Sequence, residues 1–229
     1  MVNIIPAIMP KTKGELMEKL EKVWGSVSRV QLDVVDGVFA KTVTIGPEIL
    51  GEINTIVRFD AHLMVEKPEL WLEKCMNGGV ERVIGQVEMM DDVNLFIADG
   101  QAMGMEVGLA FDLETNLERL AEVVTDLDCV LLMSVPAGAQ GQKFDVRVLK
   151  KIQEVRRLSK TLPIVVDGGI DESNIKQCLA AEWAEEMAED ELNRTFSGME
   201  FVVGSHLFAP VDTLKALEQL RHLSPPTPS

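Results

Sequence analysis

The chain has 229 residues, of which 46% are apolar and 26% are charged, so it is long enough to bury a sizeable hydrophobic core. A net charge of −15 argues against nucleic-acid and membrane partners, because so acidic a surface repels phosphate backbones and anionic lipids. No apolar run reaches the roughly 18–20 residues that span a bilayer, and no secretory leader opens the sequence, so we expect a cytoplasmic protein.

Eight short apolar runs rich in Val, Ile and Leu alternate with longer amphipathic segments. Each run has the length of a strand that is buried on both faces, as the strands of a parallel sheet are. The predicted strands are, in chain order, 4–9, 30–35, 58–64, 82–87, 106–111, 129–135, 163–167 and 201–204. The predicted helices are 12–23, 47–55, 67–76, 93–103, 117–124, 145–158, 172–181 and 211–220.

Eight strand–helix units of similar length predict an α/β protein of the (β/α)8 TIM-barrel class, with a single domain over residues 1–222. An open, doubly wound sheet is the alternative. Its Gly-x-Gly-x-x-Gly turn is missing after the first strand, where residues 9–12 read Met-Pro-Lys-Thr, and the closed barrel is therefore favoured.

Three further segments carry structural rather than chemical predictions. An acidic insertion around residues 182–197 is expected to extend the seventh helix and add a solvated surface. The Pro-rich residues 223–229 are expected to form a disordered tail. Cys75, Cys129 and Cys178 are widely spaced and are expected to fill core positions.

Polar residues at the carboxyl ends of barrel strands are candidates for the site, because the loops of that face form it. Gln31 and Asp33 share one face of the second strand, His62 and Met64 share one face of the third, and Asp167 ends the seventh. Two carboxylates and an imidazole suit Zn²⁺, Mn²⁺ or Fe²⁺, so Asp33, His62 and Asp167 are predicted metal ligands. The alternative is a buried core histidine with two turn-forming aspartates.

Glycine-bearing segments follow the last three strands, where phosphate groups bind in barrels of this kind. They are Gly138-Ala139-Gln140-Gly141, Gly168-Gly169 and Gly204-Ser205. Met64 and Met133 lie near the carboxyl ends of the third and sixth strands and are predicted to form an apolar floor for a bound sugar. The sequence thus predicts a phosphosugar site.

Seven sequence strings, taken together and in order, resemble the ribulose-phosphate 3-epimerase family. They are residues 33–39, 44–47, 62–65, 133–135, 141–144, 166–169 and 203–205, collinear with the family from residue 5 to about residue 208. The resemblance implies proton transfer at C3 of a phosphorylated ketose, interconverting ribulose 5-phosphate and xylulose 5-phosphate. It also implies a homo-oligomer.

The same resemblance implies roles for individual residues. Asp33 and Asp167 become the acid/base pair and, together with His62, ligands of a divalent metal that stabilises the enediolate. The glycine segments hold the phosphate, His62 contacts the substrate, and Met64 and Met133 cap the sugar.

Five positions depart from the family pattern. Gln31 stands where the family carries a metal-binding histidine, and its amide oxygen is expected to be the fourth ligand, with a preference shifted towards Mg²⁺ or Mn²⁺. Ala7 stands in place of a serine that contacts substrate, and Val35 in place of a capping methionine. Ala139-Gln140 interrupts the glycine-rich phosphate loop.

Three other functions stay open from the sequence. The first is a non-catalytic phosphosugar-binding protein that kept the phosphate cradle and lost the metal. The second is an epimerase for another ketose phosphate. The third, a related barrel lyase or decarboxylase, is ranked last because no lysine lies beside Asp33 or Asp167.

Overall fold

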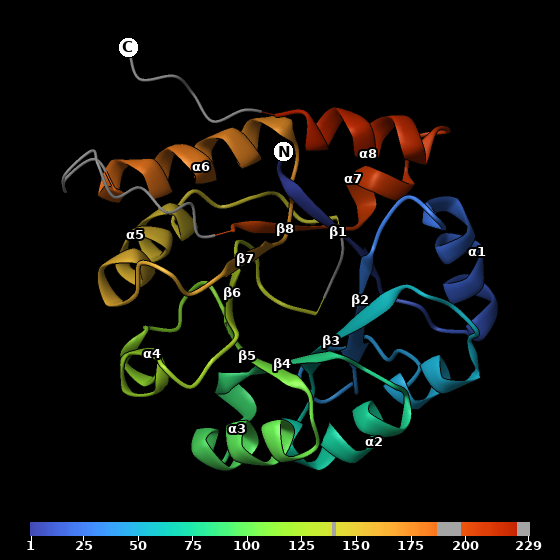
Figure 1. Ribbon diagram of the computed structural model, residues 1–229, viewed down its shortest axis with the longest axis horizontal. Helices are drawn as coiled ribbons and strands as arrows, with labels where there is room; N and C mark the ends of the chain where they lie inside the picture. The colour runs from blue at the N-terminus through green and yellow to red at the C-terminus, as the bar shows by residue number, and fades with distance from the viewer. Residues whose placement is uncertain (139–140, 187–197, 224–229) are drawn as a thin grey trace.

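The computed structural model describes residues 1–138, 141–186 and 198–223 and has a closed barrel of eight parallel strands in chain order (Figure 1). The strands are β1 (Asn3–Ile8), β2 (Arg29–Val35), β3 (Arg58–Met64), β4 (Arg82–Gln86), β5 (Glu106–Phe111), β6 (Cys129–Met133), β7 (Ile164–Asp167) and β8 (Glu200–Val203). β8 closes the barrel against β1, with Ile5 opposite Val202. The predicted (β/α)8 barrel is confirmed, and each strand begins and ends within two residues of its expected bounds.

Helices surround the barrel (Figure 1). They are α1 (Lys13–Val23), η1 (Pro47–Glu52), η2 (Pro68–Trp71), α2 (Leu72–Asn77), η3 (Val87–Met89), α3 (Val93–Ala102), α4 (Glu118–Val123), α5 (Val148–Leu158), α6 (Glu172–Glu186), α7 (Ser205–Phe208) and α8 (Thr213–Arg221). In the described part of the chain, no helix is both long and apolar enough to cross a membrane.

Two predicted helices are shorter or broken. The segment expected as a helix over 47–55 is a single 3₁₀ helix, η1, in which Ile53 N–H donates to Leu50 C=O three residues back. The segment expected over 67–76 starts at Pro68 as a 3₁₀ turn and becomes α-helical only at Leu72. Lys67, just before it, has a left-handed backbone with φ of 52°, which cannot continue a right-handed helix.

The start of the acidic insertion is partly buried, contrary to the solvated surface expected for it. Helix α6 runs five residues past its expected end at residue 181, and Glu182 accepts hydrogen bonds from Arg156 Nε at 2.8 Å and Nη2 at 2.5 Å. The pair cross-links α5 and α6. Residues 187–197 lie outside the described residues, as do residues 224–229 of the expected tail, whereas Leu223 packs against the core.

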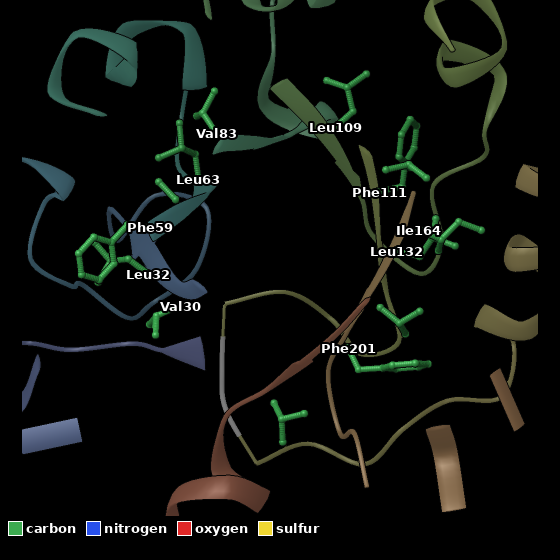
Figure 2. Close-up of a cluster of buried hydrophobic side chains, with 14 of the residues drawn as sticks. Val30, Leu32, Phe59, Leu63, Val83, Leu109, Phe111, Leu132, Ile164 and Phe201 are labelled. Atoms are coloured by element: carbon green, nitrogen blue, oxygen red, sulfur yellow. The ribbon is translucent and has the colours of Figure 1, made fainter. Parts of the chain in front are cut away.

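The core has two parts because successive strand residues point to opposite sides of the barrel wall. Residues between the wall and the helices include Val30, Leu32, Leu63, Leu132 and Phe201, which Figure 2 shows distributed around the barrel. A second cluster belongs to the alternate positions; it comprises Ile5, Ala7, Ile84, Ala110, Cys129, Leu131, Met133, Val135, Val165 and Val202. All three cysteines are buried and free, as expected.

The amino-terminal end of the barrel is filled by charged side chains. Asp60, with no exposed surface, accepts hydrogen bonds from Arg29 Nη1 at 2.5 Å and from Arg82 Nε at 3.1 Å and Nη2 at 2.5 Å. Arg82 Nη2 also donates to Glu200 at 2.7 Å, and Arg29 Nη1 to Glu106 at 3.2 Å. These five residues are called the basal ion cluster. Asp60 and His62 lie on one face of β3, with Asp60 nearer the amino-terminal end of the strand and His62 nearer its carboxyl end.

Candidate active site

Asp33, His62 and Asp167 meet at the carboxyl end of the barrel. β2 and β3 are neighbours, and their register places Asp33 directly opposite His62. Asp167 ends β7 on another part of the barrel wall. One ligand atom from each of the three residues lies within 4.8 Å of the other two. The structure therefore brings together the three residues predicted to converge.

His62 is fully buried and its ring is oriented by a neighbouring amide. Nε2 lies 3.2 Å from the Gln86 amide. The amide orientation that satisfies its neighbours turns the Gln86 oxygen to His62 and its NH₂ group to Glu88, so His62 Nε2–H donates. Nδ1 is then left to face the two carboxylates, an arrangement typical of a metal-ligating histidine.

Between Nδ1 of His62 and the two carboxylates the site favours positive charge. Nδ1 lies 3.5 Å from Asp167 Oδ2 and 3.7 Å from Asp33 Oδ1, and it has no hydrogen-bond partner among the described residues. Burial lowers the pKa of His62, but Asp167 and Asp33 outweigh it and raise this pKa to about 9. The space between them therefore suits a proton on Nδ1 or a cation bound to all three residues.

The two carboxylates also share an amide donor. Gln31 Nε2 donates to Asp33 Oδ1 at 2.7 Å and to Asp167 Oδ2 at 2.9 Å, while Gln31 Oε1 is buried without a partner among the described residues. Burial raises the pKa of Asp33, as does the charge of Asp167, whereas His62 and Gln31 lower it. Gln31 thus holds together two carboxylates that would otherwise repel each other.

The donor set fits a divalent cation. Two ligands about 2.1 Å from a tetrahedral Zn²⁺ lie roughly 3.4 Å apart, close to the distances from His62 Nδ1 to the two carboxylates. The unpartnered Nδ1 is a free nitrogen donor, and a half-turn of the Gln31 amide brings its unpartnered Oε1 to face the carboxylates. Asp33, His62, Asp167 and Gln31 are therefore the residues that would hold a metal.

A cavity opens directly over Asp33 and Asp167. The described residues of the three predicted glycine segments line it, together with Met64 and Met133. Ala139 and Gln140 of the first segment lie outside the described residues. Its lining comprises Ala7, Met9, Asp33, Met64, Met133, Val135, Gly138, Gly141, Gln142, Asp167, Gly168, Gly169, Ile170, Val202, Gly204, Ser205 and His206. His62 and Gln31 are fully buried and do not line the cavity, so they lie behind the carboxylates.

The Gly168-Gly169 turn is fixed by side chains that bind its carbonyl groups. Ser134 Oγ donates to Asp167 C=O at 3.0 Å and to Gly168 C=O, and Asn174 Nδ2 donates to Gly169 C=O at 2.8 Å. Gly169 has φ of 56°, and a Cβ atom there would lie 2.4 Å from Phe144 N. Glycine is required because the loops after β6 and β7 approach each other at this point.

Gly169→Ala should weaken binding of inorganic phosphate about tenfold and leave the barrel folded, because the loop after β6 must move away from the new Cβ. Isothermal titration calorimetry with phosphate and circular dichroism measure the two effects. Gly79→Ala is the matched control: its φ of 68° is similar, but its Cβ meets nothing within 4 Å. Equal phosphate affinities in the two variants would contradict the prediction.

Two polar residues at the site were not anticipated from the sequence. Gln86 orients His62 from the end of β4, and its only sequence signal is a polar residue closing an apolar run. His206 lines the cavity one residue after the Gly204-Ser205 pair. Asp36, in the loop after β2, has a structural task, since its carboxylate accepts hydrogen bonds from the N–H groups of Val38, Phe39 and Glu66.

Comparisons with known proteins relate the chain to one enzyme family. A family profile described as "Ribulose-phosphate 3 epimerase family" matches residues 3–187. The ribulose-phosphate 3-epimerase of Bacillus subtilis is 29% identical over 229 residues, covering 96% of this chain and 99% of that protein. That of Chlamydia muridarum is 32% identical over 189 residues, covering 79% of this chain and 83% of that protein.

Solved structures show the same fold at low sequence identity. The 3-hexulose-6-phosphate synthase of Salmonella typhimurium superposes with a TM-score of 0.67 at 15% identity, covering 96% of each chain. The orotidine 5'-monophosphate decarboxylase of Methanocaldococcus jannaschii superposes with a TM-score of 0.61 at 12% identity, covering 97% of this chain and 98% of the other.

Proposed function

Because the chain belongs to the ribulose-phosphate 3-epimerase family, we propose that it interconverts ribulose 5-phosphate and xylulose 5-phosphate by proton transfer at C3 between Asp33 and Asp167. The observation that carries the proposal is the pair of carboxylates, from β2 and β7, at the floor of a glycine-lined cavity. Epimerisation needs a base on one face of C3 and an acid on the other, which two side chains from separate strands can supply.

In this mechanism one aspartate, as a carboxylate, removes the C3 proton and becomes a carboxylic acid. The other aspartate starts as the acid and delivers its proton to the opposite face of C3, so the two residues exchange protonation states in each turnover. A divalent cation (Zn²⁺, Mn²⁺, Fe²⁺ or Mg²⁺) held by Asp33, His62, Asp167 and Gln31 would stabilise the negative charge on the substrate oxygens beside C3.

The remaining residues of the cavity hold the substrate. Backbone N–H groups of the glycine segments after β6, β7 and β8 bind the phosphate, because glycine lets an anion approach the backbone closely. Met64 and Met133 cover the sugar carbons with apolar surface. His62 and Gln31 act from behind the carboxylates, keeping them in position.

The test is conversion of ribulose 5-phosphate to xylulose 5-phosphate by the purified protein supplied separately with Zn²⁺, Mn²⁺, Fe²⁺ and Mg²⁺. We expect turnover with at least one metal and its loss after chelation. Failure to interconvert the two sugars or to exchange the C3 proton with any of the four metals would contradict the proposal. Other ketose phosphates, run in parallel, show whether the epimerase prefers a different sugar.

A second candidate function is phosphosugar binding without turnover. The observation in its favour is that the NH₂ group of Gln31 already bridges the two carboxylates. A metal must displace this donor before its oxygen ligands become available. Tight phosphosugar binding by a protein that neither retains metal nor exchanges C3 protons would favour this function.

Gln31→His should raise the metal content of the purified protein several-fold, because imidazole is a better Zn²⁺ ligand than an amide and the bridging NH₂ group is removed. Metal analysis after dialysis against a fixed concentration of free Zn²⁺ measures the change. Gln101→His, on the exposed face of α3, controls for the addition of a surface histidine. Equal metal content in the two variants would contradict the prediction.

A further inference from the structure

His206 is the one side chain able to carry positive charge among the described residues that line the cavity. The lining contains two carboxylates, Asp33 and Asp167, and among its described members neither a lysine nor an arginine. A phosphate dianion entering this cavity meets two acidic side chains and a chain with a net charge of −15. Backbone N–H groups supply only partial positive charges, so a full cation near the phosphate has a large electrostatic effect.

The position of His206 matches the expected phosphate position. It follows Gly204 and Ser205 at the end of β8, and the same cavity wall includes Gly168 and Gly169 at the end of β7. In (β/α)8 barrels the phosphate binds between the last two strands. The side chain of His206 is 40% exposed, so a ligand in the cavity can reach it without a rearrangement of the core.

Glu172 fixes one side of the imidazole. Glu172 Oε2 lies 3.4 Å from His206 Nε2, and Glu172 is in the first turn of α6, directly after the Gly168-Gly169 turn. The pair thus joins the loop after β7 to the loop after β8. With Nε2 directed to Glu172, Nδ1 is the nitrogen left to face a ligand.

We propose that His206, anchored by Glu172, binds the phosphate group of the ligand and is the one basic side chain that the described lining of this acidic cavity offers it. The inference rests on the proposed phosphosugar site and assigns the side chain that holds the phosphate there. His206 does not take part in the chemistry at C3. Its expected effect is on substrate affinity, and so on KM rather than kcat.

The first experiment uses inorganic phosphate as the probe and needs no turnover. The chain has three histidines, His62, His206 and His222, so their imidazole NMR signals can be assigned from single variants. Phosphate is expected to shift the His206 signals and leave those of His222, exposed after α8, unchanged. Unchanged His206 signals would overturn the inference.

The second experiment compares affinities. His206→Gln should bind inorganic phosphate roughly tenfold more weakly than the parent chain. A tenfold loss of affinity corresponds to the lower part of the free-energy range for hydrogen bonds to charged groups. His222→Gln is the matched control, with no expected change. Glu172→Gln keeps a hydrogen-bonding side chain without the charge and should lose less affinity than His206→Gln. Equal affinity of His206→Gln and the parent chain would overturn the inference.

The result separates this inference from the proposed function. If phosphate binding depends on His206 but no ketose phosphate is turned over, the binding role stands and the epimerase proposal fails. If the sugars are interconverted and His206→Gln leaves the KM for ribulose 5-phosphate unchanged, the epimerase proposal stands and the binding role is wrong.

Discussion

Asp167→Asn is expected to lower kcat for the interconversion of ribulose and xylulose 5-phosphates on the order of 10³–10⁴-fold. The amide keeps the size of the carboxylate and a carbonyl oxygen that can accept the hydrogen bond from Gln31, so the local structure should survive. It cannot take up or deliver the proton at C3. Asp33→Asn should have an equally large effect for the same reason.

Steady-state kinetics with saturating metal measures the loss, and circular dichroism verifies the fold. Asp212→Asn is the matched control, because Asp212 caps α8 through Lys215 N–H and asparagine caps helices equally well. The control should retain full activity. Substantial turnover by either Asp33→Asn or Asp167→Asn would show that the proton passes through another group.

Asp60→Asn should destabilise the protein by about 3–5 kcal/mol without any contact to the cavity. Asp60 is fully buried and accepts hydrogen bonds from both Arg29 and Arg82. Loss of its charge leaves two guanidinium groups facing each other at the amino-terminal end of the barrel. Burial raises the pKa of the Asp60 carboxyl, and the charges of Arg82 and Arg29 partly oppose this shift.

Urea denaturation measures the free energy of unfolding for this variant. Glu81→Gln, which breaks the exposed 3.9 Å pair with Arg58, should cost less than about 1 kcal/mol. Glu200→Gln, in which Arg82 keeps its bonds to Asp60, should fall between the two. Equal stability of Asp60→Asn and Glu81→Gln would mean that the basal ion cluster does not support the barrel.

The barrel could be predicted from the sequence because each strand is a continuous apolar run, the pattern that burial on both faces requires. The helices were harder to predict from the sequence than the strands. The segment from Pro47 forms a 3₁₀ helix, and the left-handed backbone of Lys67 delays the start of another expected helix to Pro68. Nothing in a helical pattern marks Glu182 as buried, because its burial depends on Arg156 from the preceding helix.

Part of the candidate site was also predictable, since Asp33, His62 and Asp167 end strands whose ends must meet in a closed barrel. Which side-chain atoms of the site face one another could not be predicted from the sequence. The bridging of two carboxylates by Gln31 depends on side-chain rotation, and the role of Gln86 depends on the strand beside His62. His206 was missed because the sequence alone does not show that the residue after Gly204-Ser205, in the first turn of α7, faces the cavity.

The most direct test of two-aspartate epimerisation is hydrogen exchange at C3 in D₂O, followed by NMR with each pure sugar phosphate. The parent chain should introduce deuterium at C3 of both sugars while interconverting them. Asp33→Asn and Asp167→Asn should each nearly abolish interconversion, and any exchange that survives should affect one sugar in one variant and the other sugar in the other. Exchange of the same sugar by both variants, or substantial interconversion by either, would contradict the assignment of one aspartate to each face of C3.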